Sequence, residues 1–396
     1  MKKSLLLIPL LLSLFITGCY DYEEINTRAM VIGVAFDKEG DEYIVSVQVL
    51  YIEPQSKEGT TAGTQPTLYT GRGKSIDGAL SQISLVSPRY LCFTHIQLVV
   101  IQETIAKEGV MSVLDFFMRH YESRQQFYVV ISKEKTAKDI LMIHTVLETF
   151  PTFNIIKSLD IKNIDHGLSN AITYDNLLSI IIKDGIHPLV PGIEIIGSVE
   201  QGKKKETTEE MEPPTQIMVS TLGIFKEDRL LDWLNIDESW GYNFAMGNIK
   251  EKVLEFPCDD KNYSASLITG VKPNNKVKID DDKITAEITV NITGRISEVN
   301  CDIYLDNPKN IELLTSKASK EVERLIQTAI TKSKELNTDI FGVERMVYQT
   351  DYKHWKKIKE KWDEIYPEIE FKVKVNTTLL RRGLLDDTIF KGDLSE

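Results

Sequence analysis

Apolar and polar residues alternate without a break from Ile284 to Thr293, and this alternation constrains the fold of the second half of the chain. Successive side chains of a strand point to opposite faces of its sheet, so the segment predicts a strand with one buried and one wet face. A sheet that is wet on one side favours antiparallel pairing. The run from Ile369 to Leu380 predicts a final strand, because Ile369, Phe371, Val373 and Val375 alternate with charged residues.

Helical patterns lie between these two strands. Pro308 begins a long helix that runs to about Leu336, because its apolar residues recur three or four positions apart. A second helix follows Phe341, and a third is expected from Trp355 to Glu364. Strands followed by helices and then a strand predict an α+β domain with an antiparallel sheet and helices packed on one face.

The third of these helices carries two tryptophans. Trp355 and Trp362 are seven residues apart and therefore share a face, with lysines beside them. An amphipathic helix of this kind could lie on lipid. Packing of the tryptophans against the C-terminal sheet, with the lysines in solvent, is the favoured interpretation.

The first half of the chain interleaves strands and helices. Two β-rich runs around a glycine-containing turn predict a hairpin of Met30 to Asp37 with Tyr43 to Tyr51. Glu53 to Pro66 is almost free of apolar residues, and we expect a mobile loop there. The elements expected after it are a helix from Ser75 to about Leu85, a strand from Phe93 to Ile101, a helix from Val110 to His120, a strand from Gln126 to Ser132, helices between Ala137 and Lys183, and a short strand from Ile193 to Ile196.

A charged, proline-terminated run from Gly202 to Pro214 separates this half from the rest of the chain and predicts a linker or a long exposed loop. Ile217 to Phe225 and Leu230 to Trp233 then predict a hairpin. We therefore expect an α+β fold of three domains, with mixed or antiparallel sheets flanked by helices. The expected boundaries are a leader at 1–18, an N-terminal α+β domain at 19–200, a linker at 201–214, a small middle domain at 215–262 and a C-terminal α+β domain at 263–396.

The leader has the pattern of a bacterial lipoprotein signal. Lys2 and Lys3 precede a short apolar run, and Leu14-Phe-Ile-Thr-Gly-Cys19 closes it with small residues before a cysteine. The run is too short to span a bilayer. We expect cleavage before Cys19 and lipidation of its thiol, and the two or three chains of such a lipid make attachment durable. The alternative is an ordinary secretory peptide followed by a chance cysteine.

Charge excludes one class of partner. The whole sequence has a formal net charge of -12, and removal of the two leader lysines brings it to -14. A protein with this balance lacks the basic surface that binds nucleic acid. It is also mildly repelled by an anionic bilayer, which suggests that the lipid, and no cationic surface, holds the protein at the membrane.

Three cysteines remain after Cys19. Their spacing fits neither a zinc clip nor a redox pair, and we expect no metal and no cofactor. Cys92 lies in an apolar stretch and is expected to be a buried free thiol. A bridge between Cys258 and Cys301 is possible outside the cytoplasm, and the sequence leaves it open.

Familiar catalytic motifs are not matched. Gly71-Arg-Gly-Lys-Ser75 resembles a phosphate-binding loop, but Leu68 stands where such a loop needs a glycine. A glycine turn that ends in a serine helix cap explains the same residues. No histidine lies in an H-E-x-x-H motif, and no G-x-S-x-G elbow occurs.

Charged residues gather after the helix that ends at His120. Arg119, Glu122 and Arg124 predict either local ion pairs at the end of that helix or arginines that dock a partner. His95 is expected within a strand, where a hydrogen-bonded structural histidine is commoner than a ligand or a base.

Several segments, spaced along the chain in the same order, resemble the C-subunit lipoproteins of spore germinant receptors, the Ger(x)C family. The departures are Tyr20, where the family usually has Trp, Tyr22, near which it usually has a basic residue, and Ser333 to Glu335, where a glutamine is common. The similar segments are Cys19 to Asn26, Val31 to Asp37, Pro88-Arg89, His95 to Val100, Leu114 to Arg119, Glu122 to Arg124, Gly223 to Phe225, Asp232 to Asn235, Asp339 to Gly342, Trp355 to Trp362 with Pro367, and Arg382-Gly383.

The resemblance implies a three-domain, non-enzymatic protein that is anchored to the outer face of the spore inner membrane through lipid on Cys19. Its partners would be the A-type and B-type polytopic subunits with which it senses the nutrients that trigger germination. Whether this subunit binds the nutrient is left open. The residues that we assign to a partner interface on this basis are Arg89, His95, Arg119 and Arg124.

Two other classes share the anchor. A solute-binding lipoprotein of an ATP-driven (ABC) importer usually has parallel strands that are apolar throughout, and the alternating strands argue against it. An anchored cell-wall hydrolase needs a pair of positioned carboxylates or a metal set. With 59 acidic residues in the chain, the sequence does not exclude such a pair.

Overall fold

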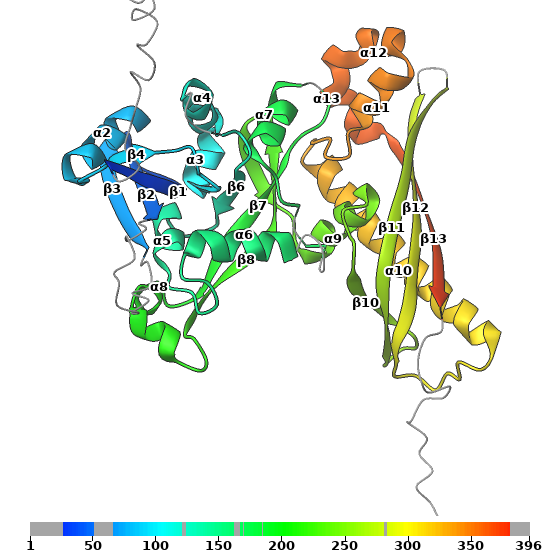
Figure 1. Cartoon of the computed structure of the whole chain (residues 1–396). Helices are drawn as coiled ribbons and strands as arrows, with labels where there is room; N and C mark the ends of the chain where they lie inside the picture. The colour runs from blue at the N-terminus through cyan, green and yellow to red at the C-terminus, as the bar shows by residue number, and fades with distance from the viewer. Residues whose placement is uncertain are drawn as a thin grey trace, which may run out of the picture.

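The structure, a computed structural model, describes residues 27–50, 66–120, 124–161, 167–168, 170–183, 185–280 and 283–380. The chain forms two sheets with helices around them, one from each half of the sequence (Figure 1). The predicted leader, Cys19, most of the predicted loop at 53–66, Glu122 and Arg382-Gly383 lie outside the described residues.

Within the described residues, nine strands form the larger sheet, in the order β3-β2-β1-β5-β6-β7-β8-β9, with β4 paired to β1. Strands β1, β5, β6 and β7 run parallel to one another, and antiparallel pairs continue the sheet on both sides. The strands are β1 (Arg28–Glu39), β2 (Glu42–Leu50), β3 (Thr67–Gly73), β4 (Tyr90–Cys92), β5 (Leu98–Gln102), β6 (Tyr128–Ser132), β7 (Leu189–Gly197), β8 (Thr215–Lys226) and β9 (Arg229–Trp233).

Helices cover both faces of the larger sheet, which explains why its central strands are apolar throughout. Val99 and Ile101 of β5 pack in the same core as α2 (Ile76–Val86), α4 (Met111–Arg119) and α7 (Tyr174–Ile182). Leu98 and Val100 pack on the opposite side with α5 (Ala137–Met142) and α6 (Pro151–Ile161). The remaining helices of this half are α3 (Glu103–Glu108), α8 (Val199–Gly202) and the 3-10 turn η3 (Lys205–Glu209).

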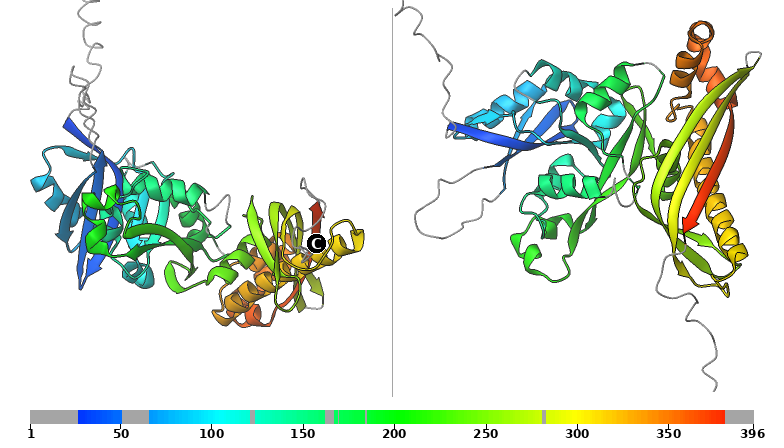
Figure 2. Two further views of the ribbon diagram at one scale, coloured as in Figure 1. Left: turned by 90° about the horizontal axis from the view of Figure 1, so that it is seen from below. Right: turned by 45° about the vertical axis from the view of Figure 1, so that its right-hand side comes forward.

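The smaller sheet has the order β10-β11-β12-β13 and carries the long helix α10 (Pro308–Glu335) on one face (Figures 1 and 2). The strands are β10 (Lys252–Pro257), β11 (Tyr263–Asp280), β12 (Lys283–Val299) and β13 (Glu370–Leu380). The apolar residues of the alternating segment are buried, as the alternation predicts. The predicted α+β class is confirmed.

The direction of one strand in the smaller sheet differs from the prediction. The predicted C-terminal sheet is antiparallel, but β13 pairs parallel to β12 over its whole length. The segment between them contains α10, which returns the chain to the end at which β12 began, and a parallel partner needs such a crossover. Alternation reports which face is buried, and it carries no information on strand direction.

Two other predicted elements differ in extent. Strand β5 begins at Leu98, so His95 lies in the turn before it instead of in the strand. The predicted helix from Trp355 to Glu364 is broken into α12 (Tyr352–Ile358), η4 (Lys359–Lys361), α13 (Trp362–Ile365) and η5 (Tyr366–Glu368). Tight 3-10 turns change the rotation per residue, so Trp362 is buried in the core while Trp355 stacks beside Tyr352 near the surface.

Residues 215–262, which the sequence predicts as a middle domain, contribute to both sheets. Strands β8 and β9 extend the larger sheet, whereas α9 (Ile236–Met246) and β10 pack in the core of the smaller one. In the segment predicted as a linker, Thr207 is buried and donates a hydrogen bond to the carbonyl of Gln201 (2.5 Å). The domain boundaries stay a prediction.

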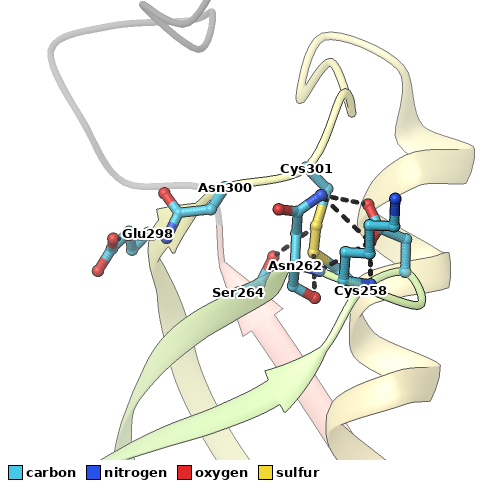
Figure 3. Close-up of a disulfide and its surroundings, with 8 residues drawn as sticks. Cys258, Asn262, Ser264, Glu298, Asn300 and Cys301 are labelled. Atoms are coloured by element: carbon cyan, nitrogen blue, oxygen red, sulfur yellow. Dashed lines mark hydrogen bonds between the residues drawn. A yellow bond between two sulfur atoms is a disulfide. The ribbon is translucent and has the colours of Figure 1, made fainter.

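A disulfide joins Cys258, just after β10, to Cys301, just after β12, with their Cα atoms 6.3 Å apart (Figure 3). Strand β11 starts between them, and the Ser264 hydroxyl lies 3.9 Å from the Cys301 sulfur. The bridge therefore fixes three neighbouring strands at one end of the smaller sheet. Cys92 is a buried free thiol, as predicted.

We expect the Cys258→Ser/Cys301→Ser variant to lose stability. The bridge closes a loop of 43 residues, and the loss of such a loop constraint costs about 2–4 kcal/mol in free energy of unfolding. Urea denaturation of residues 20–396 measures the difference. A reducing agent should lower the stability of the parent and leave the variant unchanged, and equal stability of the two under oxidising conditions would contradict a structural role.

Candidate interaction sites

Strands β1, β4, β5 and β6 run parallel to one another and therefore begin at the same edge of the larger sheet. We call this end of the sheet, with the first residues Arg28, Tyr90, Leu98 and Tyr128, the strand-start edge. The edge is stepped, because Leu98 and Tyr128 are level with Gly33, five residues after Arg28. Arg28 is paired directly with Tyr90, and Tyr128 donates its backbone N–H to the carbonyl of Gln97 (2.9 Å). Residues far apart in the sequence are thus brought to one side of the molecule.

Three of the four predicted interface residues precede strands at this edge. Arg89 comes before β4, His95 before β5 and Arg124 a few residues before β6. His95 and Arg124 are exposed, whereas Arg89 is half-buried. That these three residues dock a partner stays a prediction. If they do, the strand-start edge is the surface that the partner contacts.

Arg119 has a local partner. It ends α4, and its Nε donates to Asp115 one turn earlier at 2.7 Å. The exposed pair lowers the pKa of the Asp115 carboxyl and raises that of the guanidinium, each through the hydrogen bond with the other. This is the local ion pair that the sequence suggests as the alternative to docking, and such a surface pair contributes little to stability.

Arg119 also borders a pocket of about 410 Å³ at the start of α2, lined in part by Lys74 and Ser75. The Ser75 hydroxyl accepts the N–H of Gly78 at 3.1 Å and caps the helix, as predicted. A Cβ at Gly71 would lie 2.0 Å from the carbonyl oxygen of Ala79. Gly71 is therefore needed for the close packing of α2 on β3. This packing explains the glycine without a phosphate ligand.

The two halves meet through a reciprocal pair of hydrogen bonds. His187 donates its backbone N–H to the carbonyl of Asp339 (2.9 Å), and Asp339 donates its own N–H to His187 Nδ1 (3.0 Å). The Asp339 carboxylate accepts the N–H groups of Val343 (2.9 Å) and Glu344 (2.7 Å) at the start of α11 (Val343–Thr350). One buried side chain thus caps a helix beside the contact between the halves.

Burial shifts the titration of both partners. It raises the pKa of Asp339 to about 7, although the backbone N–H groups at α11 act in the opposite direction. It lowers the pKa of His187 to about 4. Both groups therefore favour their neutral forms, which reduces the cost of placing them between the halves.

The junction is flanked by ion pairs and by a shallow pocket. Lys226 pairs with Asp363 at 2.9 Å and Lys332 with Asp232 at 2.6 Å, each pair joining the two halves. A pocket of about 440 Å³ beside it is lined by Ile182, Lys183, Gly185, Arg345, Tyr348, Gln349 and Trp355. Pockets at such boundaries are common ligand sites, but the side chains here are largely exposed.

One group of donors could hold a metal ion by spacing alone. Cys258, Asp259 and Cys301 place their ligand atoms within 4.8 Å of one another. Thiolates bind metal only when they are free, and these two sulfurs are joined. Asp259 accepts hydrogen bonds from Lys261 and Asn262 instead. These residues therefore fit a disulfide-stapled turn better than a metal site.

Sequence reasoning missed the buried carboxylates. Asp37 at the end of β1 accepts the N–H groups of Ala137 (2.6 Å) and Lys138 (2.9 Å), and burial raises its pKa to about 6. The available signal was an acidic residue directly after a buried apolar run. The residues that Asp37 caps lie 100 positions further along, and the sequence does not show that contact.

Two family models match the chain: the one described as a spore germination protein N-terminal domain over residues 21–195, and the one described as spore germination B3/GerAC-like, C-terminal, over residues 220–383. Spore germination protein KC of Bacillus subtilis (strain 168) is 29% identical over 99% of this chain and 100% of its own length. Spore germination protein B3 of the same strain is 24% identical over 93% and 95%.

A crystal structure described as that of the GerBC protein has the same fold. The alignment covers 91% of this chain and 100% of that one, with a TM-score of 0.57 and 20% sequence identity. In the part of the chain that the structure describes, every helix is too short or too polar to cross a bilayer.

Because the pKa of the buried Asp339 is raised, we expect the stability of the fold to depend on pH. Its folded pKa of about 7 lies above the ordinary value of 3.8, so its contribution is complete below about pH 4 and is lost as the pH rises through 7. A shift of this size corresponds to roughly 4 kcal/mol. We expect Asp339→Asn to remove this fall, as measured by urea denaturation of residues 20–396 from pH 4 to 8. Asp306→Asn, at an exposed loop position, is the control, and parallel curves for Asp339→Asn and the parent would refute the assignment.

Proposed function

Because the chain belongs to the Ger(x)C family of spore germination proteins, we propose that it is the lipid-anchored C subunit of a nutrient germinant receptor. The observation that carries the proposal is that the two family models match in order over nearly the whole chain. Full-length alignment with spore germination protein KC supports the same assignment.

We propose anchoring through lipid on Cys19. Support comes from the leader, whose small residues stand directly before the cysteine. The Cys258–Cys301 disulfide is an independent support, since such bonds persist in oxidising compartments outside the cytoplasm. Together they favour a body on the outer face of the spore inner membrane.

The proposed role is that of a non-enzymatic interaction subunit that works with A-type and B-type polytopic subunits. The buried carboxylates support this role, since Asp37 and Asp339 each hold two backbone N–H groups and are thereby occupied in capping helices. Arg89, His95 and Arg124 are proposed contacts with these partners, because they share the strand-start edge with the first described residues. Arg119 is a weaker proposal, since Asp115 pairs with it.

The family assignment favours the receptor subunit over a solute-binding lipoprotein of an ABC importer. The antiparallel β10-β11-β12 sheet also differs from the parallel lobes expected of such a binding protein.

The anchor is tested by Cys19→Ala in the full-length protein, expressed in sporulating cells. Without the thiol no thioether lipid forms, and we expect the amount in the membrane fraction to fall about tenfold or more. Nutrient germination should fail with it. Cys92→Ala, which removes a buried thiol outside the lipoprotein signal, should leave the protein in the membrane fraction. Unchanged fractionation of Cys19→Ala would remove the anchoring proposal.

Partner contact is tested at Arg124. Charge reversal by Arg124→Glu should reduce co-purification of the polytopic subunits from spore membranes by about tenfold, the usual effect of losing one strong interface residue. Arg72→Glu is the control, because Arg72 lies near the opposite edge of the sheet, where it pairs with Glu39. Equal recovery of partners with both variants would place the contact elsewhere.

A further inference from the structure

Three large apolar side chains are exposed beside the point where the described chain begins. Leu85 and Val86 end α2 and Tyr90 begins β4, with exposed fractions of 77%, 64% and 79%. We call these three residues the α2–β4 patch. Large apolar side chains exposed within one short segment of a soluble body often mark a contact with another molecule or with a membrane.

The patch lies next to the proposed tether. Tyr90 is the direct partner of Arg28 in the parallel β1–β4 pair, and Arg28 is the second described residue. Both figures of the whole molecule place the start of β1 at the end remote from the smaller sheet (Figures 1 and 2). The patch therefore belongs to the part of the molecule that the tether holds closest to its attachment point.

The length of the tether limits how far the patch can move away. Eight residue steps separate Cys19 from Thr27, and a fully extended chain gains at most about 3.5 Å per step. Thr27, the residue directly before β1, therefore lies within roughly 28 Å of a lipidated cysteine.

The segment that carries the patch contains no acidic residue. From Gly78 to Gln102 the sequence contains no Asp or Glu, although 59 of its 396 residues are acidic. The other exposed residues near the end of α2 are the uncharged Ser81, Gln82 and Ser84. Arg89, which directly precedes Tyr90, borders a pocket of about 290 Å³ with Ser87 and Pro88.

We propose that the α2–β4 patch rests on the outer leaflet of the membrane and orients the body on it, an inference that depends on the proposed lipid at Cys19. Leucine and valine side chains would enter the boundary between headgroups and acyl chains, and tyrosine is enriched at that depth. Asp21, Glu23 and Glu24 in the tether oppose a purely electrostatic attraction, so apolar contact provides the orientation.

This contact would turn the strand-start edge toward the membrane. His95 and Arg124, which precede β5 and β6 at that edge, then face the level at which membrane-embedded partners expose their loops. The smaller sheet, at the other end of the molecule, projects away from the bilayer (Figure 2).

The test uses the lipidated full-length protein in vesicles of phosphatidylcholine and phosphatidylglycerol. The fluorophore NBD is attached at Val86→Cys or, as a control, at Val253→Cys, a similarly exposed position on β10 of the smaller sheet. Nitroxide groups on the acyl chains should quench the label at 86 about twofold or more relative to the label at 253, because only the first enters the bilayer. Leu85→Glu combined with Tyr90→Glu should abolish that difference.

The outcomes separate this inference from the anchoring proposal. Protein that fails to sediment with the vesicles would overturn the anchor and this inference together. Protein that sediments while its label at 86 is quenched no more than that at 253 would leave the anchor standing and overturn the patch contact. Cross-linking from position 86 to a membrane protein in spore membranes, with no quenching by lipid, would assign the patch to a protein partner and overturn the lipid contact.

Discussion

Strand β1 is the element on which the arrangement of the larger sheet depends. It pairs with β2 on one side and with β4 and β5 on the other, and its residues from Val31 to Asp37 are all buried. A strand covered on both faces must be apolar on both faces, which its sequence satisfies. The proposed tether enters at its first residue, so any force on the anchor reaches the centre of the sheet directly.

Two buried carboxylates hold the starts of two helices in place. Asp37 fixes the start of α5 to the end of β1, and Asp339 fixes the start of α11 beside the contact with His187. A buried helix start leaves backbone N–H groups without partners, and an unsatisfied buried donor costs about 1–3 kcal/mol. Both aspartates meet that need at the cost of a raised pKa. Each carboxylate is held by the backbone N–H groups that it accepts, so its role is structural.

Local patterns in the sequence were sufficient for most elements and insufficient for their assembly. The alternation at Ile284 to Thr293 reports a half-buried strand whatever its neighbours, so β12 was predictable and the parallel direction of β13 was not. The broken helix after Trp355 has an apolar spacing that an unbroken helix would share. The gathering of Arg89, His95 and Arg124 at one edge required the strand order, because each precedes a different strand. Arg119 stood in the same sequence cluster as Arg124, yet an acid one helical turn earlier engages it.

The two ends of the molecule are held in place in different ways. Beyond β10 the ends of three strands of the smaller sheet are tied by the Cys258–Cys301 bridge, which restricts the unfolded chain and needs no additional apolar surface. At the strand-start edge no bridge is present among the described residues, and exposed apolar side chains remain at the end of α2. Exposed leucine, valine and tyrosine next to a short tether carry a solubility cost in water that burial against another surface removes. A lipid-anchored body always has such a surface within reach, so the same side chains that are a liability in a free protein become an orienting contact in an anchored one.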